Sequence, residues 1–224
     1  MSHWNPAPFA QQLLDLFASL LLLIAFAMLS QRRILTLIHL FAWQGLILTL
    51  SIADSAWLTH QPHLYYSAVL TLITKVLILP LLLHRLIRRL DVVWDVETLI
   101  NIPTTMLVGI GLVVFSFNLA LPISHFSSTI LRNTLGIALA SVLLSFMMMI
   151  TRRKAVPQVI GFLALENGLF LAATSATYGM PMVVELGVAL DVLVGMFIFG
   201  IFFFQIRETF DSLDIRHMEK LKEE

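Results

Sequence analysis

The sequence predicts an all-α polytopic membrane protein of about seven transmembrane helices, with the N-terminus outside and the C-terminus in the cytoplasm. Of its 224 residues, 58% are hydrophobic and only 12% are charged, whereas soluble domains average about a quarter charged residues. Apolar segments of roughly 20 to 27 residues, long enough to cross the hydrocarbon layer as helices, alternate with short polar breaks. The formal net charge is zero, so overall charge gives no indication of a nucleic-acid partner.

The whole chain, residues 1–224, is predicted to form a single transmembrane domain with two parts. Residues 151–224 hold the last two spans, near 156–178 and 180–206, followed by a tail that is either a solvated helix end or a docking segment for a soluble partner. The first apolar segment follows no basic region and no small-residue cleavage site, so we expect it to be retained as a span. Residues 8–150 hold five spans, near 8–30, 34–58, 65–89, 98–121 and 128–150.

The basic residues predict how the chain is oriented. Of the 14 Lys and Arg residues, 12 lie in alternate loops and in the tail, all on one side of the membrane in the predicted topology. The exceptions are Lys75 and Arg132, which fall within spans. Cytoplasmic loops are enriched in basic residues, so this side is predicted to be cytoplasmic. An odd number of spans agrees with this assignment.

The residue types exclude several kinds of chemistry within this chain. There are no cysteines, which excludes disulfides, thiolate-held iron–sulfur clusters and a cysteine-ligated nickel site. The sequence also lacks a Walker loop, zinc-ligand spacing, a nucleophile elbow and a dinucleotide fingerprint. We therefore expect no catalytic residue, no metal ligand and no cofactor in this chain; in redox chemistry, another subunit would carry the metal.

Three ionisable residues lie deep in predicted spans. Lys75, Glu166 and Asp191 each lie about 15 Å from the start of their span, at 1.5 Å of rise per residue, so they fall near one plane. A charge near the bilayer centre costs about 2.5 kcal/mol or more and usually faces a bundle interior or water. The three residues are therefore predicted to form a buried polar site. A group whose proton affinity is changed by burial can exchange protons with a water chain.

Neighbouring residues support this prediction. Gly187, Asp191 and Gly195 are spaced by four, so they share one helix face, where the glycines let another helix approach closely. Pro80 follows Lys75 by five residues, and a proline removes a backbone hydrogen bond, here to the carbonyl of Val76. We therefore expect a locally opened, polar stretch of helix beside the lysine.

A structural alternative remains for each of these groups. The alternative for Lys75 is that it only pairs with a carboxylate and holds helices together, and the same role is open to Glu166 and Asp191. Glu185, about 9 Å before Asp191 along the helix axis, is either an outer proton relay or a carboxylate hydrated near the interface.

Secondary polar candidates are His39, Gln44 and Asn167. His39 and Gln44 make either a polar contact between helices or part of a proton relay. Asn167 is expected to complete a local hydrogen-bond network beside Glu166.

Three separated motifs carry a family resemblance. They are IGFLALENG in span six, VELGVALD in span seven and ITKVLILPL in span three. They match the patterns I-G-x-x-x-x-E-N-G, V-E-[IL]-G-[IV]-A-x-D and I-T-K-V-L-x-[VI]-P-L of the HyfE-type membrane subunit of hydrogenase-4 and formate hydrogenlyase, which the chain resembles. The last two spans resemble, more distantly, the NuoK subunit of respiratory complex I and the MrpC subunit of cation/proton antiporters. In that comparison Asp191 corresponds to a membrane glutamate of NuoK, and Glu166 lies one helical turn from another.

The resemblance implies a non-catalytic subunit of a complex I-related, energy-converting complex in a bacterial or archaeal inner (cytoplasmic) membrane. Its implied partners are antiporter-like and quinone-site-like membrane subunits and, indirectly, a cytoplasmic hydrogenase or other redox arm. On this hypothesis Glu166 and Asp191 belong to a hydrated proton-translocation axis, with Lys75 as their electrostatic partner.

Other functions remain open on the sequence alone. One is a purely structural linker between antiporter-like subunits, and another is a stand-alone ion transporter. A retinal protein would need its lysine in the last span, where this chain has none.

Overall fold

The computed structural model describes residues 7–59, 62–90, 98–121 and 129–177, together with 187, 190 and 193–195. Over these residues the chain is almost entirely helical, and an isolated bridge pairs Thr98 with Arg152. The all-α class is therefore confirmed. The helices are α1 (Ala7–Ser30), α2 (Ile34–Thr59), α3 (Pro62–Thr71), the π-helix η1 (Leu72–Ile78), α4 (Leu79–Leu90), α5 (Ile102–Ala120), α6 (Thr129–Thr151) and α7 (Ala155–Thr177).

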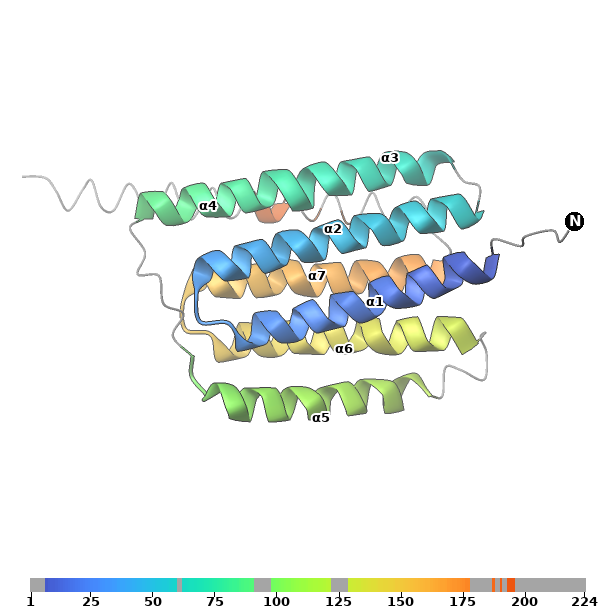
Figure 1. Cartoon of the computed structure of the whole chain (residues 1–224). Coiled ribbons are helices and arrows are strands. Elements are labelled where there is room, and N and C mark those ends of the chain that lie inside the picture. Colours follow the sequence, from blue (N-terminus) through green and yellow to red (C-terminus); the bar gives the residue numbers. More distant parts are fainter. Residues whose placement is uncertain are drawn as a thin grey trace, which may run out of the picture.

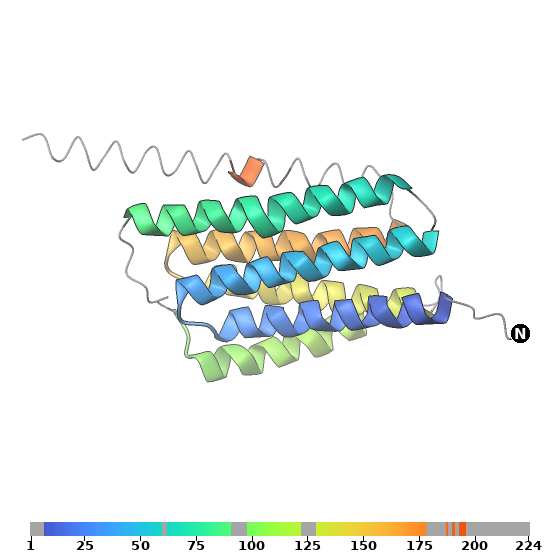
Figure 2. The same ribbon diagram turned by 45° about the horizontal axis from the view of Figure 1, so that its top comes forward.

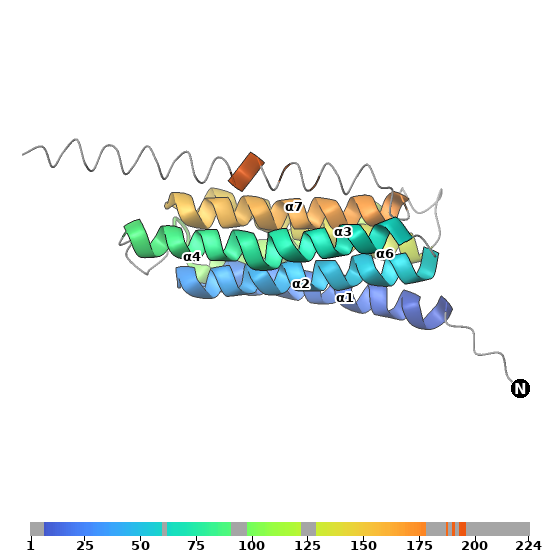
Figure 3. The same ribbon diagram turned by 90° about the horizontal axis from the view of Figure 1, so that it is seen from above.

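The helices lie side by side with their axes nearly parallel (Figure 1). Four of them form the centre: α1 and α2 make one layer, and α6 and α7 lie behind them (Figures 2 and 3). The continuous α3–η1–α4 helix packs on α2 at one edge, and α5 packs on α6 and α1 at the other. Successive helices run alternately up and down the bundle (Figure 1).

Six helices are long and apolar enough to cross a membrane within the described part of the chain. This finding makes the chain a polytopic membrane protein and confirms six of the predicted spans. The seventh predicted span, 180–206, lies outside the described residues except for residues 187, 190 and 193–195, which are helical. The six segments are Gln11–Ser30, Ile34–Leu58, Leu64–Arg88, Ile102–Ala120, Thr134–Thr151 and Val156–Thr174.

The fourth span begins later than predicted. Residues 98–101 are not helical; Asn101 is extended and caps α5, which has Pro103 in its first turn. Proline is favoured there because the first helical N–H groups have no partner within the helix. The preceding residues instead pair with the α6–α7 connection, where the N–H of Leu99 donates to the carbonyl of Thr151 at 2.8 Å.

The third span has the irregularity expected beside Lys75, in the form of a π-helix. Over Leu72–Ile78 the turn is wider than in an α-helix, and the N–H of Leu79 donates to the carbonyl of Thr74, five residues back. Pro80 follows at once and has no N–H to offer an α-helical bond. Single π turns inside α-helices are rare and are frequent at functional sites.

Two apolar clusters fill the bundle, one toward each end. The basic-end cluster includes Phe41 of α2, Leu79 and Leu83 of α4, and Ile160 and Leu163 of α7. The far-end cluster includes Leu48 and Ile52 of α2, Leu64 and Ala68 of α3, and Phe170 and Leu171 of α7. Along α2, along α7 and along the continuous α3–η1–α4 helix, a short stretch of chain separates the two clusters.

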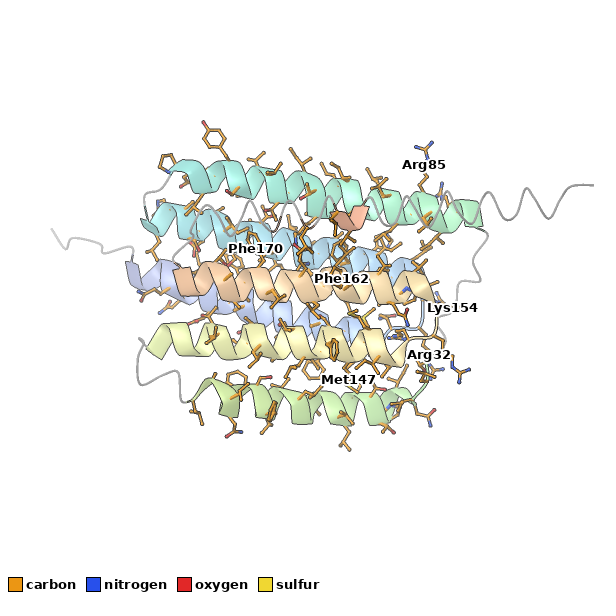
Figure 4. The ribbon with its side chains drawn as sticks, turned by 180° about the vertical axis from the view of Figure 1, so that it is seen from behind. Arg32, Arg85, Met147, Lys154, Phe162 and Phe170 are labelled. Carbon is orange, nitrogen blue, oxygen red and sulfur yellow. The ribbon has the colours of Figure 1, made fainter. Side chains whose placement is uncertain are left out.

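Basic residues gather at one end of the bundle. Arg32, Arg85 and Lys154 lie there together although they come from three different connections or helix ends (Figure 4). This arrangement is the one that the predicted orientation requires; that the end faces the cytoplasm stays a prediction.

Candidate functional site

A buried ion pair joins the third and sixth spans. The Nζ atom of Lys75, on η1, lies 2.9 Å from Oε1 of Glu166, on α7, and the two side chains are only 2% and 6% exposed. Both residues come from the middle of their spans, as the estimates from helix rise predicted. The acid in the apolar stretch GFLALENGLFLA thus has its counter-charge on another helix.

Two amides extend this pair into a network across three helices. Lys75 also donates from Nζ to Oδ1 of Asn167 at 2.8 Å, and Asn167 donates from Nδ2 to Oε1 of Gln44, on α2, at 3.2 Å. All of these side chains are buried. We call Lys75, Glu166, Asn167 and Gln44 the Lys75 network. Asn167 thus joins Lys75 to Gln44, and Gln44 makes a polar contact between helices.

A glycine lets α2 approach the lysine closely. A Cβ atom at Gly45 would lie 3.0 Å from Cβ of Lys75 and 3.3 Å from its carbonyl carbon and oxygen. Small residues permit this kind of backbone approach between membrane helices. Gly45 therefore fixes how near Gln44 lies to the other members of the network.

The Lys75 network lies between the two apolar clusters. On α2, Gln44 falls between Phe41 and Leu48, and on α7, Glu166 and Asn167 fall between Leu163 and Phe170. Within the described bundle, apolar side chains of the two clusters therefore lie on both sides of the network along the bundle axis.

The chain approaches Glu166 again at Gly187. A Cβ atom built at Gly187 would lie 3.7 Å from Oε1 of Glu166, and 2.7 and 2.8 Å from Cδ2 and Cε2 of Phe170. The ring centroid of Phe170 lies 5.7 Å from Nζ of Lys75. The predicted seventh span thus comes into contact with the ion pair at a glycine.

Two buried polar atoms near the network have no hydrogen-bond partner among the described residues. They are Nε2 of Gln44 and Oγ1 of Thr71, which lies one turn before Lys75. A buried donor left without a partner costs about 1–3 kcal/mol, and such groups are normally satisfied by buried water. The surroundings of Lys75 are therefore polar enough to hold a buried water molecule.

The remaining predicted site residues are not brought to the network by the described structure. Asp191 and Glu185 lie outside the described residues. His39 is exposed on α2, because five residues separate it from Gln44 and the two side chains point to different sides of the helix. Among the described residues, no group of three or more metal-binding side chains is present.

Arg152 was not recognised from the sequence as a buried residue. Its side chain is 1% exposed, and Nη2 donates to the carbonyl of Leu29 at 2.8 Å and to that of Met28 at 3.3 Å. These are carbonyls of the last turn of α1, which have no partner within their own helix. Burial lowers the pKa of Arg152 to about 10, so the side chain remains charged near neutral pH. In the sequence it is one of three consecutive basic residues, which gave no sign of its burial.

Six apolar helices in the described part of the chain, with a lysine–glutamate pair buried between the third and sixth spans, define a polytopic α-helical membrane protein with a buried polar site. No family model matches the chain, and no solved structure matches it.

Curated relatives cover most of the chain. It is 29% identical over 212 residues to the uncharacterized protein Rv0085 of Mycobacterium tuberculosis (strain ATCC 25618 / H37Rv), which covers 94% of this chain and 96% of that protein. It is 25% identical over 182 residues to hydrogenase-4 component E of Escherichia coli (strain K12), covering 81% and 84%. The values for hydrogenase-4 component E of Shigella flexneri are the same. The chain is therefore a distant homologue of hydrogenase-4 component E.

Proposed function

We propose that this chain is a non-catalytic membrane subunit of a hydrogenase-4-related, complex I-like assembly, and that the Lys75–Glu166 pair takes part in its proton translocation. The distant similarity to hydrogenase-4 component E supports membership of such a complex. Its neighbours would be antiporter-like and quinone-site-like subunits of a bacterial or archaeal cytoplasmic membrane. A hydrogenase, formate-oxidising or other redox arm would supply the driving reaction.

The ion pair at mid-depth is the observation that carries the proton-translocating role. When a proton reaches the Glu166 carboxylate, the attraction between Glu166 and Lys75 is lost. Asn167 then still accepts a hydrogen bond from Lys75, since Oδ1 lies 2.8 Å from Nζ. The pair thus has two charge states that the same side chains can hold, and a change of charge in a neighbouring subunit would shift the balance between them.

The apolar clusters at both ends favour proton exchange within the membrane plane. A route along the bundle axis would pass through Leu163 or through Phe170. Gly187 is within reach of Glu166, and Asp191 follows it by four residues. We therefore propose Asp191 as the next carboxylate after Glu166, with Glu185 as an outer relay. This in-plane route is consistent with the likeness of the last two spans to NuoK and MrpC.

Neutralising Glu166 tests the proposal. We expect that E166Q, in a complex of normal composition, lowers proton transport per redox turnover, because the amide cannot take up the proton. Transport would be followed in inverted membrane vesicles and assembly by co-purification of the other subunits. E97Q, at a glutamate that precedes α5 in the sequence, is the matched Glu→Gln control and should transport normally. Normal transport and redox activity in E166Q would contradict the proposal.

A purely structural linker is the second candidate function, because the same pair joins η1 to α7. Removing one partner of a buried pair costs about 3–5 kcal/mol, whereas replacing both by apolar residues of similar volume is often neutral or stabilising. K75M alone should therefore reduce the yield of the complex, and K75M/E166M should restore it. If the restored complex transports protons normally, the pair is structural. If the complex assembles but does not transport protons, the pair takes part in proton transport.

A further inference from the structure

The outward face of α2 carries a histidine and a tryptophan within its membrane span. Trp43 is 58% exposed and Leu50 44% exposed, and His39 is exposed as well. These positions are spaced by four and seven residues, so the three side chains share one face of the helix. The other sides of α2 pack on α1, on α7 and on the α3–η1–α4 helix (Figure 3).

His39 and Trp43 lie deep in this span. The span runs from Ile34 to Leu58, and at 1.5 Å of rise per residue His39 lies about 7.5 Å and Trp43 about 13.5 Å from its start. Trp43 is therefore within about 5 Å of the middle of the span. Tryptophans of membrane proteins are enriched at the two membrane surfaces, which is the depth of Trp57, next to the other end of the span.

The described chain supplies neither side chain with a hydrogen-bond partner. Among the described residues, no hydrogen bond is made by His39 or by Trp43. An indole N–H can only donate, lipid tails hold no acceptor, and an unmet polar group in hydrocarbon costs several kcal/mol. Histidines within membrane spans almost always face a bundle interior or water, whereas His39 faces outward from this bundle. The face is therefore better suited to protein than to lipid.

We propose that the His39–Trp43–Leu50 face of α2 is the docking surface for a transmembrane helix of another subunit, which presents hydrogen-bond acceptor oxygens at the depth of His39 and Trp43. The inference rests on the proposed membership of a larger membrane complex and adds the surface by which this chain joins it. Aromatic residues with a polar tip are typical of protein interfaces, and histidine is among the side chains that hydrogen-bond between membrane helices.

The docking surface lies at the depth of the ion pair, on the other side of α2. Gln44 and Gly45 follow Trp43 directly in the sequence but turn inward. Gln44 belongs to the Lys75 network, and Gly45 closely approaches Lys75. A charge that changes on the docked helix would therefore act on the ion pair across the width of one helix, about 10 Å with its side chains.

Substitutions on this face test the docking, because protein contact and lipid contact predict different results. We expect H39L and W43F to reduce several-fold the amount of other subunits that co-purifies with the chain, while the chain itself accumulates in the membrane as the wild type does. H39Q keeps a hydrogen-bond donor and should retain more of the complex than H39L. W57F, at the exposed tryptophan near the end of the span, is the matched control and should have no effect. If lipid alone covers the face, H39L removes an unmet polar group and leaves co-purification unchanged, which would overturn the proposal.

A cross-link identifies what covers the face without altering His39 or Trp43. Because the chain has no cysteine, a maleimide–benzophenone probe can be attached to L50C alone and irradiated in native membranes, and the purified products identified by mass spectrometry. The proposal predicts a product with a subunit that co-purifies with the wild type, and less of it when H39L is combined with L50C. Adducts with lipid only, or with a second copy of this chain, would overturn it.

The outcomes separate the docking surface from the proposed function. If H39L and W43F behave like W57F while E166Q stops transport, the docking surface is wrong and the proton-translocating role stands. If L50C cross-links to another subunit while E166Q transports normally, the docking surface stands and the proton-translocating role fails. If no other subunit co-purifies with the wild-type chain, the proposed membership of a complex fails, and the docking surface fails with it.

Discussion

At the scale of single residues, two of the basic side chains that the structure describes, Lys75 and Arg152, are buried, and they are held in different ways. Lys75 has a carboxylate and an amide oxygen as partners. Arg152, by contrast, is held through backbone carbonyls of α1. The lysine thus has a partner that can take up a proton, and the arginine has partners that cannot. This difference makes Lys75 suited to proton chemistry and Arg152 to fixing the ends of helices.

Arg152 should therefore matter for stability, and equally so throughout the neutral pH range. R152A removes hydrogen bonds from a charged donor and leaves a cavity, so we expect a loss of about 2–4 kcal/mol. R153A, at the exposed neighbour, should change stability by less than about 0.5 kcal/mol. The thermal midpoint of the detergent-purified protein measures both. Similar midpoints for the two variants would show that the carbonyl contacts do not hold the bundle.

The pH dependence of the Arg152 effect has a definite sign. Burial lowers its pKa from the ordinary value of an arginine to about 10, so the unfolded chain binds the proton more tightly than the folded one. Stability from this residue therefore rises with pH only between these two values and is constant below them. The difference between R152A and the wild type should then stay the same between about pH 6 and 8.

At the scale of elements, the third span shows what proline next to a buried lysine does to a helix. The π-helix Leu72–Ile78 ends one residue before Leu79, and Pro80 follows. The wider turn accommodates a ring that would clash with the carbonyl one turn back in an α-helix. It also turns Lys75 inward together with Leu79 and Leu83, which lie on the same inner face.

Replacing Pro80 by a residue that has a backbone N–H should disturb the ion pair. In P80A an α-helical bond to Val76 becomes available, so we expect the π turn to tighten and Lys75 to rotate away from Glu166. A double-mutant cycle with K75M and E166M measures this. The coupling energy, about 1–3 kcal/mol for residues in contact, should fall sharply in the P80A background. P103A, at a proline in the first turn of α5, should leave the coupling unchanged, and equal coupling in P80A would contradict the π-helix interpretation.

The positions of the helices can be predicted from the sequence where they depend on hydropathy. The predicted bounds of six spans agree with the structure within a few residues, because apolar length and basic loops act locally. The predicted start of α5 is four residues too early, because the pairing of Thr98 with Arg152 is a tertiary contact. The mid-depth of Lys75 and Glu166 followed from helix rise, but their pairing needed the packing of η1 on α2 and α7. The contact of Phe170 with Gly187 had no signal in the sequence beyond the glycine itself.

At the scale of the whole molecule, the bundle has polar groups at mid-depth and apolar clusters toward both ends. Such a layering does not suit conduction straight through a single chain. It suits exchange with neighbours at the depth of the pair, which is why a subunit of a larger complex explains the arrangement better than a stand-alone transporter. The side from which a neighbour meets the pair depends on the predicted seventh span and its orientation.

The number of spans and the orientation can be tested together because the chain has no cysteine. Single cysteines at Ser2, Ser124 and Ser212 would be labelled in intact cells with a membrane-impermeant maleimide. The positive-inside rule and seven spans predict labelling of S2C and S124C without permeabilisation, and of S212C only after it. Labelling of S2C and S212C from the same side would mean an even number of spans, and would leave Asp191 without the transmembrane position that the proton axis requires. Reversed labelling would instead keep seven spans and place the basic end outside.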